Sequence, residues 1–227
     1  MNSLIVSSVL FVLSHMVLSA YPVRRRLVNH MGIWPFLGVY CLIAGTVFWA
    51  MLNAYLDSPY ELIWQPPIAF RHLAISVMLL CCIFLVSGYT SANAAAVGAD
   101  KTVALMDQPK GIFRVTRHPV MWAVGLWATT HFVANGTWAA MWFFGTLAFL
   151  AFAGAVHMDH RKLRERGTDW QDYLNRTSSV PFLAIGQGRQ QFLLGEIGVW
   201  RLAISVLLYG GLLLIHESFT GASPLPL

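Results

Sequence analysis

The stretch TRHPVMWAVGLWATTHFVANGTW, residues 116–138, decides the fold class of this chain. Pro119 stands where the first turn of a helix accepts a residue without an N–H. An apolar helix is then predicted to continue to Asn135, where the following glycine is a typical stop. Its interior holds one ionisable side chain, His131, which shares a face with Trp127 and Asn135 because they are four residues apart. A histidine inside an apolar span is costly without a partner, so we interpret it as functional.

The composition around this stretch is that of an integral membrane protein. The chain has 227 residues, of which 57% are hydrophobic and only 11% charged, and its mean hydropathy is +0.60. These values exclude an ordinary soluble domain. The three cysteines lie inside apolar runs, where a thiol is usually a small hydrophobic side chain rather than half of a disulfide.

Six apolar spans follow one another along the chain, each near the ~20 residues that a helix needs to cross a bilayer. The predicted fold is therefore an all-α bundle of about six transmembrane helices that forms a single domain over residues 1–227. The only sizeable polar segment is the loop 158–198, whose first half is predicted to continue the fifth helix and to stop at Gly167. The spans are 1–21, 35–53, 72–90, 119–134, 137–157 and 199–216.

The charges of the loops predict the topology. The net charge of +5 could indicate a nucleic-acid partner, but the basic residues gather in alternate loops, so we expect none. By the positive-inside rule these loops are cytoplasmic and both termini lie outside. The first span lacks a basic n-region and precedes three arginines, so we expect a retained helix rather than a signal peptide. The basic loops contain Arg24, Arg25 and Arg26, then Lys101, Lys110, Arg114 and Arg117, and then Arg161, Lys162, Arg164, Arg166, Arg176 and Arg189.

A second histidine, His15, lies inside the first span. Two neutral imidazoles on different helices of a bundle suit the axial positions of a haem iron, with His15 and His131 as the metal ligands. Trp127 would form part of an apolar wall, and Arg117 and His118 at the cytoplasmic mouth could bind the haem propionates. In the alternative, each histidine donates one hydrogen bond to a neighbouring helix and binds nothing.

The depths of these two histidines in the membrane differ. Counted from opposite ends of their spans, His15 and His131 are about 10 Å apart along the membrane normal, at 1.5 Å per residue. A tilted cofactor could absorb this difference; otherwise His15 would pair better with His118 or His157. A zinc site is less favoured because no third and fourth ligand stand at metal spacing.

Several motifs resemble those of the NnrU family of bacterial membrane proteins. They are RHP at 117–119, WAxxH at 127–131, and RTSxxPFxAIxxGRQ at 176–190. The same motifs look like those of zeta-carotene isomerase of plants and cyanobacteria, a relative of that family. The resemblance implies haem b with His15 and His131 as axial ligands, and a location in the bacterial inner membrane. Ala128 stands where the plant enzyme has a cysteine, so a switch from histidine to cysteine ligation is not implied here.

Three classes of function follow as hypotheses. The first is a haem b protein that serves nitrogen-oxide metabolism in denitrification, with nitric oxide as a partner. The second is a haem-dependent cis–trans isomerase of a carotenoid-like polyene. The third is a cofactor-free accessory protein or a membrane methyltransferase, because RHP also opens the cofactor motif of isoprenylcysteine-type methyltransferases. In that motif a tyrosine stands where this chain has Met121.

Overall fold

The computed structural model describes residues 2–94 and 108–225. In this part of the chain the regular structure is helical, apart from an isolated bridge between Leu62 and Thr137. The long helices are α1 (Asn2–Ser19), α3 (Ile33–Leu56), α4 (Ile68–Thr90), α7 (Pro119–Asn135), α8 (Trp138–Arg166) and α12 (Val199–Thr220). The short ones are α2 (Tyr21–Met31), α6 (Ile112–Val115), α9 (Thr168–Arg176), α10 (Leu183–Gly186) and α11 (Leu194–Ile197).

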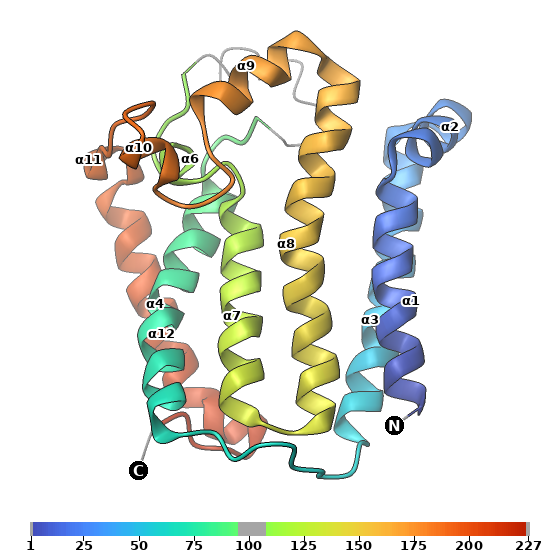
Figure 1. The fold of residues 1–227 in the computed structure, drawn as a ribbon, viewed down its shortest axis with the longest axis vertical. Helices are drawn as coiled ribbons and strands as arrows, with labels where there is room; N and C mark the ends of the chain where they lie inside the picture. The colour runs from blue at the N-terminus through green and yellow to red at the C-terminus, as the bar shows by residue number, and fades with distance from the viewer. Residues whose placement is uncertain (1, 95–107, 226–227) are drawn as a thin grey trace.

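The long helices run side by side along one axis of the molecule (Figure 1). Contacts between neighbours follow the order α12, α4, α7, α8, α1, α3, so α7 lies in the middle of the bundle. The hairpin of α1 and α3 packs against α8 on one side, and α12 packs against α4 on the other. This arrangement confirms the predicted all-α membrane bundle.

Five of the helices in the described part are long and apolar enough to cross a membrane: α1, α3, α4, α8 and α12. The sixth predicted span is α7, which has only 17 residues. Its two main contacts are with α4 and α8, so protein covers much of its surface. A helix in that position needs less contact with lipid than its neighbours.

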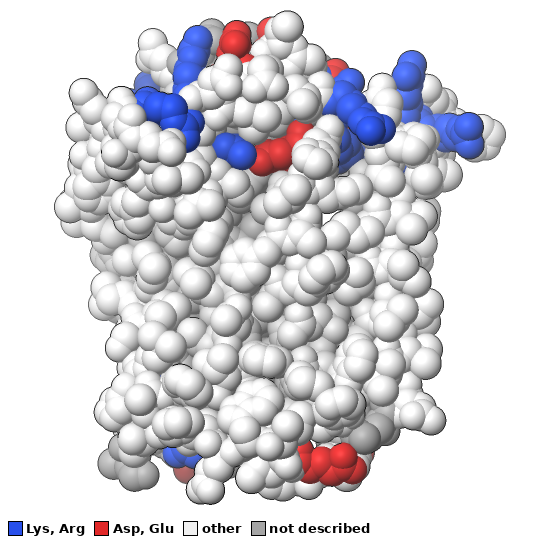
Figure 2. Space-filling model, viewed as in Figure 1, with Lys and Arg blue, Asp and Glu red and all other residues white. Residues whose placement is uncertain are grey.

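The two ends of the bundle differ in charge. Figure 2 shows that lysine and arginine side chains gather mainly at the end where α2 and α9 lie. We call this the basic end. Both termini lie at the opposite end, which we call the terminal end (Figure 1). The positions of the termini agree with an even number of crossings. Lys101, one of the basic residues from which the topology was predicted, lies outside the described residues.

The turn between α7 and α8 shows why the predicted stop is so sharp. Gly136 has φ +72°, and Thr137 caps α8 by accepting a hydrogen bond from the amide of Ala140 at 3.2 Å. A Cβ atom on Gly136 would lie 2.1 Å from the carbonyl oxygen of Trp64. Glycine is thus required at position 136 for two reasons: its backbone is left-handed, and the 57–67 loop approaches too closely for a Cβ atom.

Aromatic rings fill the space between α1, α3 and α8. The ring centres of Phe11 and Phe48 are 5.8 Å apart, and those of Phe48 and Phe143 are 6.2 Å apart. Phe143 lies 5.1 Å from Phe144, which in turn contacts α7. Rings at these separations pack favourably beyond the area that they bury. The resulting core joins the α1–α3 hairpin to the centre of the bundle.

The 158–198 segment is ordered around α8 and α9. As predicted, α8 continues through the polar sequence to Arg166 and stops at Gly167, which has φ +58°. Trp170 and Tyr173 of α9 are buried and pack on Ala94. Burial raises the pKa of the Tyr173 phenol, which therefore stays neutral. The segment thus forms a packed cover over the basic end.

Candidate functional site

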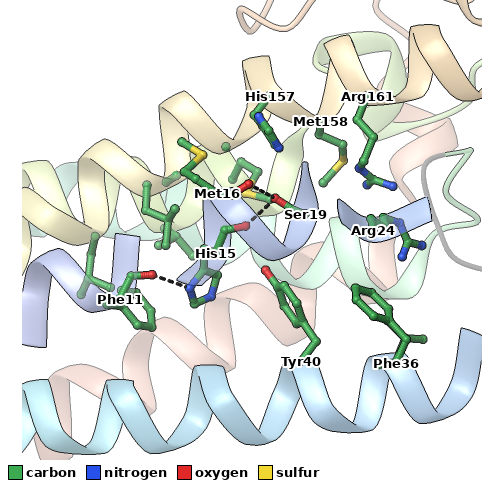
Figure 3. Close-up of a pocket in the computed structure, with 17 residues that line it drawn as sticks. Phe11, His15, Met16, Ser19, Arg24, Phe36, Tyr40, His157, Met158 and Arg161 are labelled. Carbon is green, nitrogen blue, oxygen red and sulfur yellow. Dashed lines mark hydrogen bonds between the residues drawn. The ribbon is translucent and has the colours of Figure 1, made fainter. Parts of the chain in front are cut away.

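His15 lines a cavity of about 390 Å³ between α1, α3, α7 and α8, which we call the His15 cavity (Figure 3). The Nδ1 atom of His15 lies 2.8 Å from the carbonyl oxygen of Phe11. Because a carbonyl can only accept, Nδ1 carries the proton and Nε2 keeps a lone pair. The ring of Tyr40 stands edge-on to the imidazole, with 5.6 Å between the ring centres.

The wall of the His15 cavity toward the basic end carries a second histidine and two arginines. Nε2 of His157 and Nε of Arg161 are buried and lack a hydrogen-bond partner among the described residues. Arg161 and Arg24 share Glu165, at 3.0 Å and 3.6 Å. Figure 3 shows His15 directed toward α3, however, while His157 extends from α8. The two imidazoles line one cavity without facing each other.

His131 lines a different cavity, also of about 390 Å³, which we call the His131 cavity. It lies between α4, α7 and α12 and opens toward the terminal end, where Arg71 and Tyr60 line it. Trp127 and Asn135 line it as well, which confirms that these two residues and His131 share one face of α7. The other walls are mainly aliphatic and come from α4 and α12: Ala74, Ile75, Met78, Leu212 and Leu213.

The histidine nearest to His131 is His216 of α12. Their ring centres are 6.4 Å apart, with 34° between the ring planes, and both residues line the His131 cavity. Nδ1 of His131 donates to the carbonyl of Trp127 at 2.8 Å, and Nδ1 of His216 lies 2.9 Å from the carbonyl of Ala222. Each imidazole therefore has an Nε2 lone pair available.

The structure does not bring His15 and His131 together. Phe132, next to His131, lines a third, apolar cavity together with Ser8 of α1. Ser8 is seven residues before His15, so the two histidines differ by about 10 Å along the bundle axis. The rings from Phe11 to Phe144 also lie between them. The structure places the two histidines in separate cavities, and joint ligation of one haem by His15 and His131 stays a prediction.

The side chains of Arg117 and His118 both bind the carboxylate of Asp159 of α8. Nε of Arg117 and Nε2 of His118 lie 2.8 Å and 2.9 Å from the two carboxylate oxygens. The amide of Arg117 also donates to the carbonyl of Ser178 at 3.0 Å. The side chains of all three residues are largely buried. This network joins α7, α8 and the 158–198 segment, so its geometry indicates that these residues stabilise the packing of the three elements. Propionate binding by Arg117 and His118 stays a prediction.

The sequence interpretation missed His216 and Arg71 as members of the His131 cavity. His216 lies near the end of the last span, where it looks like an ordinary interfacial residue. Its depth in the membrane could have indicated its role. His131 and His216 are both within about five residues of the ends of their helices at the terminal end of the bundle. Neighbouring helices with histidines at one depth bring them together.

Taken together, the bundle and its cavities define an all-α integral membrane protein with paired histidines between helices. The chain belongs to the NnrU family: residues 3–224 match the family described as "NnrU protein". The match covers nearly the whole chain and includes every long helix.

Two curated plant proteins are similar to part of the chain. It is 40% identical over 95 residues to "15-cis-zeta-carotene isomerase, chloroplastic" of Arabidopsis thaliana, and 36% identical over 95 residues to the protein of the same name from Zea mays. The match covers 39% of this chain and 26% of each relative, so the chain matches about a quarter of their length. No solved structure matches.

Proposed function

We propose that this protein is a membrane isomerase that changes the configuration of a double bond in a long conjugated polyene, and that its reaction site is the His131 cavity. The observation that carries the proposal is the position of His131 and Trp127 in one apolar cavity within the bundle. Both belong to the WAxxH motif that resembles zeta-carotene isomerase. The identity of 40% to such an isomerase supports the same activity class.

The walls of the His131 cavity suit a hydrocarbon. Aliphatic side chains of α4 and α12 would bind the apolar chain, and the indole of Trp127 would pack on its conjugated part. Leu212, which is 41% exposed, lies at the edge of the cavity. A lipid-dissolved substrate would thus enter sideways from the bilayer without crossing water.

Haem b is the proposed cofactor. When bound, it would supply a Lewis acid or one-electron partner that lowers the order of the double bond during rotation. The residues that would hold it are imidazoles whose Nδ1 atoms bond to backbone carbonyls, which leaves Nε2 for the iron, and the His131 cavity contains two of them. The role in nitrogen-oxide metabolism, with nitric oxide as ligand, rests on the family alone and is a second, separate prediction.

For location, we propose the bacterial inner membrane with the basic end in the cytoplasm and both termini in the periplasm. The two named relatives are chloroplastic. Fusion of a periplasm-specific reporter to either terminus would test this orientation. Activity of a cytoplasm-specific reporter there would contradict it.

The experiment is to express the chain in bacteria that accumulate a cis isomer of zeta-carotene, and to separate the isomers chromatographically. Conversion to the trans isomer by wild type, above cells without the protein, is expected. Ala134→Leu fills the His131 cavity, which Ala134 lines, without lowering helix propensity. We expect it to reduce conversion at least ~10-fold, which corresponds to about 1.4 kcal/mol in the barrier.

Gly154→Leu is the matched control. Gly154 lines the His15 cavity, and a Cβ atom there meets nothing within 4 Å. This variant fills the other cavity by a similar volume, so conversion should stay within about twofold of wild type. Loss of conversion in Gly154→Leu alone would indicate that the substrate binds in the His15 cavity instead. No conversion by folded, haem-loaded wild type would contradict the isomerase function.

A further inference from the structure

We propose that His131 and His216 together form a bis-imidazole site for a metalloporphyrin, haem b, in the His131 cavity. The inference rests on the proposed function only in taking haem as the cofactor. It assigns the second axial position to His216 of α12 instead of His15.

The separation of the two rings supports this pair. Two imidazoles that bind one metal ion from opposite sides have ring centres roughly 6.3 Å apart, at a metal–nitrogen distance of about 2.0 Å. The ring centres of His131 and His216 are 6.4 Å apart. Two helices from different parts of the chain thus hold the imidazoles at the spacing that a shared metal requires.

The hydrogen bonds of both rings agree with ligation. Metal-binding histidines usually donate their second ring N–H to a carbonyl or carboxylate, which sets the tautomer and the ring orientation. His131 has this bond to Trp127, and His216 has it to Ala222. Nε2 is then the ligating atom in both rings.

The lack of further protein ligands in the described part of the chain favours a metalloporphyrin over a bare metal ion. Among the described residues, no group of three or more His, Cys, Asp or Glu side chains could hold a metal ion. Two imidazoles alone leave a zinc or copper ion without its usual third and fourth protein ligands. A metal that carries its own equatorial nitrogen ligands needs only the two axial ones.

The terminal end of the cavity supplies a counter-charge for the carboxylates of a haem. Arg71, in the first turn of α4, lines the cavity beside Tyr60 and Asn135. No ion pair joins Arg71 to an acidic residue in the described part of the chain. Its guanidinium can therefore bind a propionate by charge-assisted hydrogen bonds.

The experiment measures bound haem in detergent-purified full-length protein, without reference to turnover. Wild type should show the optical and electron paramagnetic resonance spectra of a low-spin, bis-histidine haem. His131→Ala and His216→Ala should each lower the amount of low-spin haem per protein at least ~10-fold. The decrease would come either from loss of haem or from conversion of the bound iron to high spin. Added imidazole should restore the low-spin spectrum in either variant if the cavity is intact. Arg71→Gln should weaken haem retention less than either histidine variant.

His15→Ala is the decisive control, because His15 lies in the other cavity. It should retain a wild-type haem spectrum. Loss of the low-spin spectrum in His15→Ala with its retention in His216→Ala would overturn the assignment and favour His15 as the ligand. Wild type that binds no haem would overturn it as well. Haem bound through His131 and His216 in a protein that isomerises no polyene would leave this site standing and contradict only the proposed activity.

Discussion

His118 and Asp159 join the start of α7 to the basic end of α8 through a hydrogen bond of 2.9 Å between Nε2 and Oδ1. The imidazole is 2% exposed and the carboxylate 9%. Asp159 also binds Arg117 at 2.8 Å, so one buried carboxylate holds two consecutive residues of the RHP motif. The motif therefore sets the position at which α7 enters the bundle, and with it the depth of His131, which is four residues before the end of the helix at Asn135.

Replacement of Asp159 should destabilise the protein strongly. Asp159→Asn keeps the shape of the side chain but leaves the buried charge of Arg117 without its partner. We expect a loss of about 3 kcal/mol in the free energy of unfolding, since removing one member of a buried ion pair leaves an uncompensated charge. Thermal unfolding in detergent would measure this.

Glu165→Gln is the matched control on the same helix. Glu165 pairs with Arg161 and Arg24, and its side chain is 27% exposed. Solvent screens such a pair, so the expected loss is within about 1 kcal/mol. Equal effects of the two substitutions would show that Asp159 has no special role in the packing of α7 against α8.

Gly136→Ala should disrupt the turn between α7 and α8 more than its backbone angle alone requires. Gly221 has the same φ of +72°, but a Cβ atom there meets nothing within 4 Å. Gly221→Ala should cost about 1 kcal/mol for the left-handed conformation. Gly136→Ala adds the 2.1 Å contact with the carbonyl oxygen of Trp64, so we expect about 2 kcal/mol more. Similar unfolding temperatures for the two variants would contradict the close approach.

Glu196 should make stability depend on pH through its pairing with Arg114. A bidentate contact at 2.8 Å and 3.1 Å holds the pKa of Glu196 below its ordinary value of 4.5, and the amide of Gly111 adds to this effect. Because the folded-state pKa is lowered, the pair stabilises the protein above the unfolded pKa. That contribution is lost as the pH falls through the folded-state pKa.

Unfolding curves of wild type and Glu196→Gln, measured from neutral to acidic pH, would test this dependence. At neutral pH the variant should be less stable by about 1 kcal/mol, since the pair is partly exposed to solvent. The difference should begin to shrink as the pH falls below about 4.5, because the unfolded chain then takes up a proton at Glu196 while the folded protein does not. It should vanish once the pH has also passed the lowered folded-state pKa. A difference that stays constant across this range would show that the charge of Glu196 does not contribute.

Much of the fold could be predicted from local sequence features. The apolar run lengths and the stops at Gly136 and Gly167 were sufficient for the long helices, because a helix satisfies its own backbone hydrogen bonds wherever a membrane surrounds it. The four-residue spacing of Trp127, His131 and Asn135 likewise predicted one shared face. These features depend on neighbours along the chain and not on the packing of the bundle.

The composition of the site depends on which helices become neighbours. No local pattern shows that α12 packs against α4, so His216 could not be assigned to the cavity of His131 from the sequence. The 10 Å difference in depth was visible in advance, but whether helix tilt would absorb it depends on packing. The aromatic rings from Phe11 to Phe144 keep α1 away from His131. Residue spacing determines which side chains share a helix face, whereas contacts between distant segments determine which faces meet.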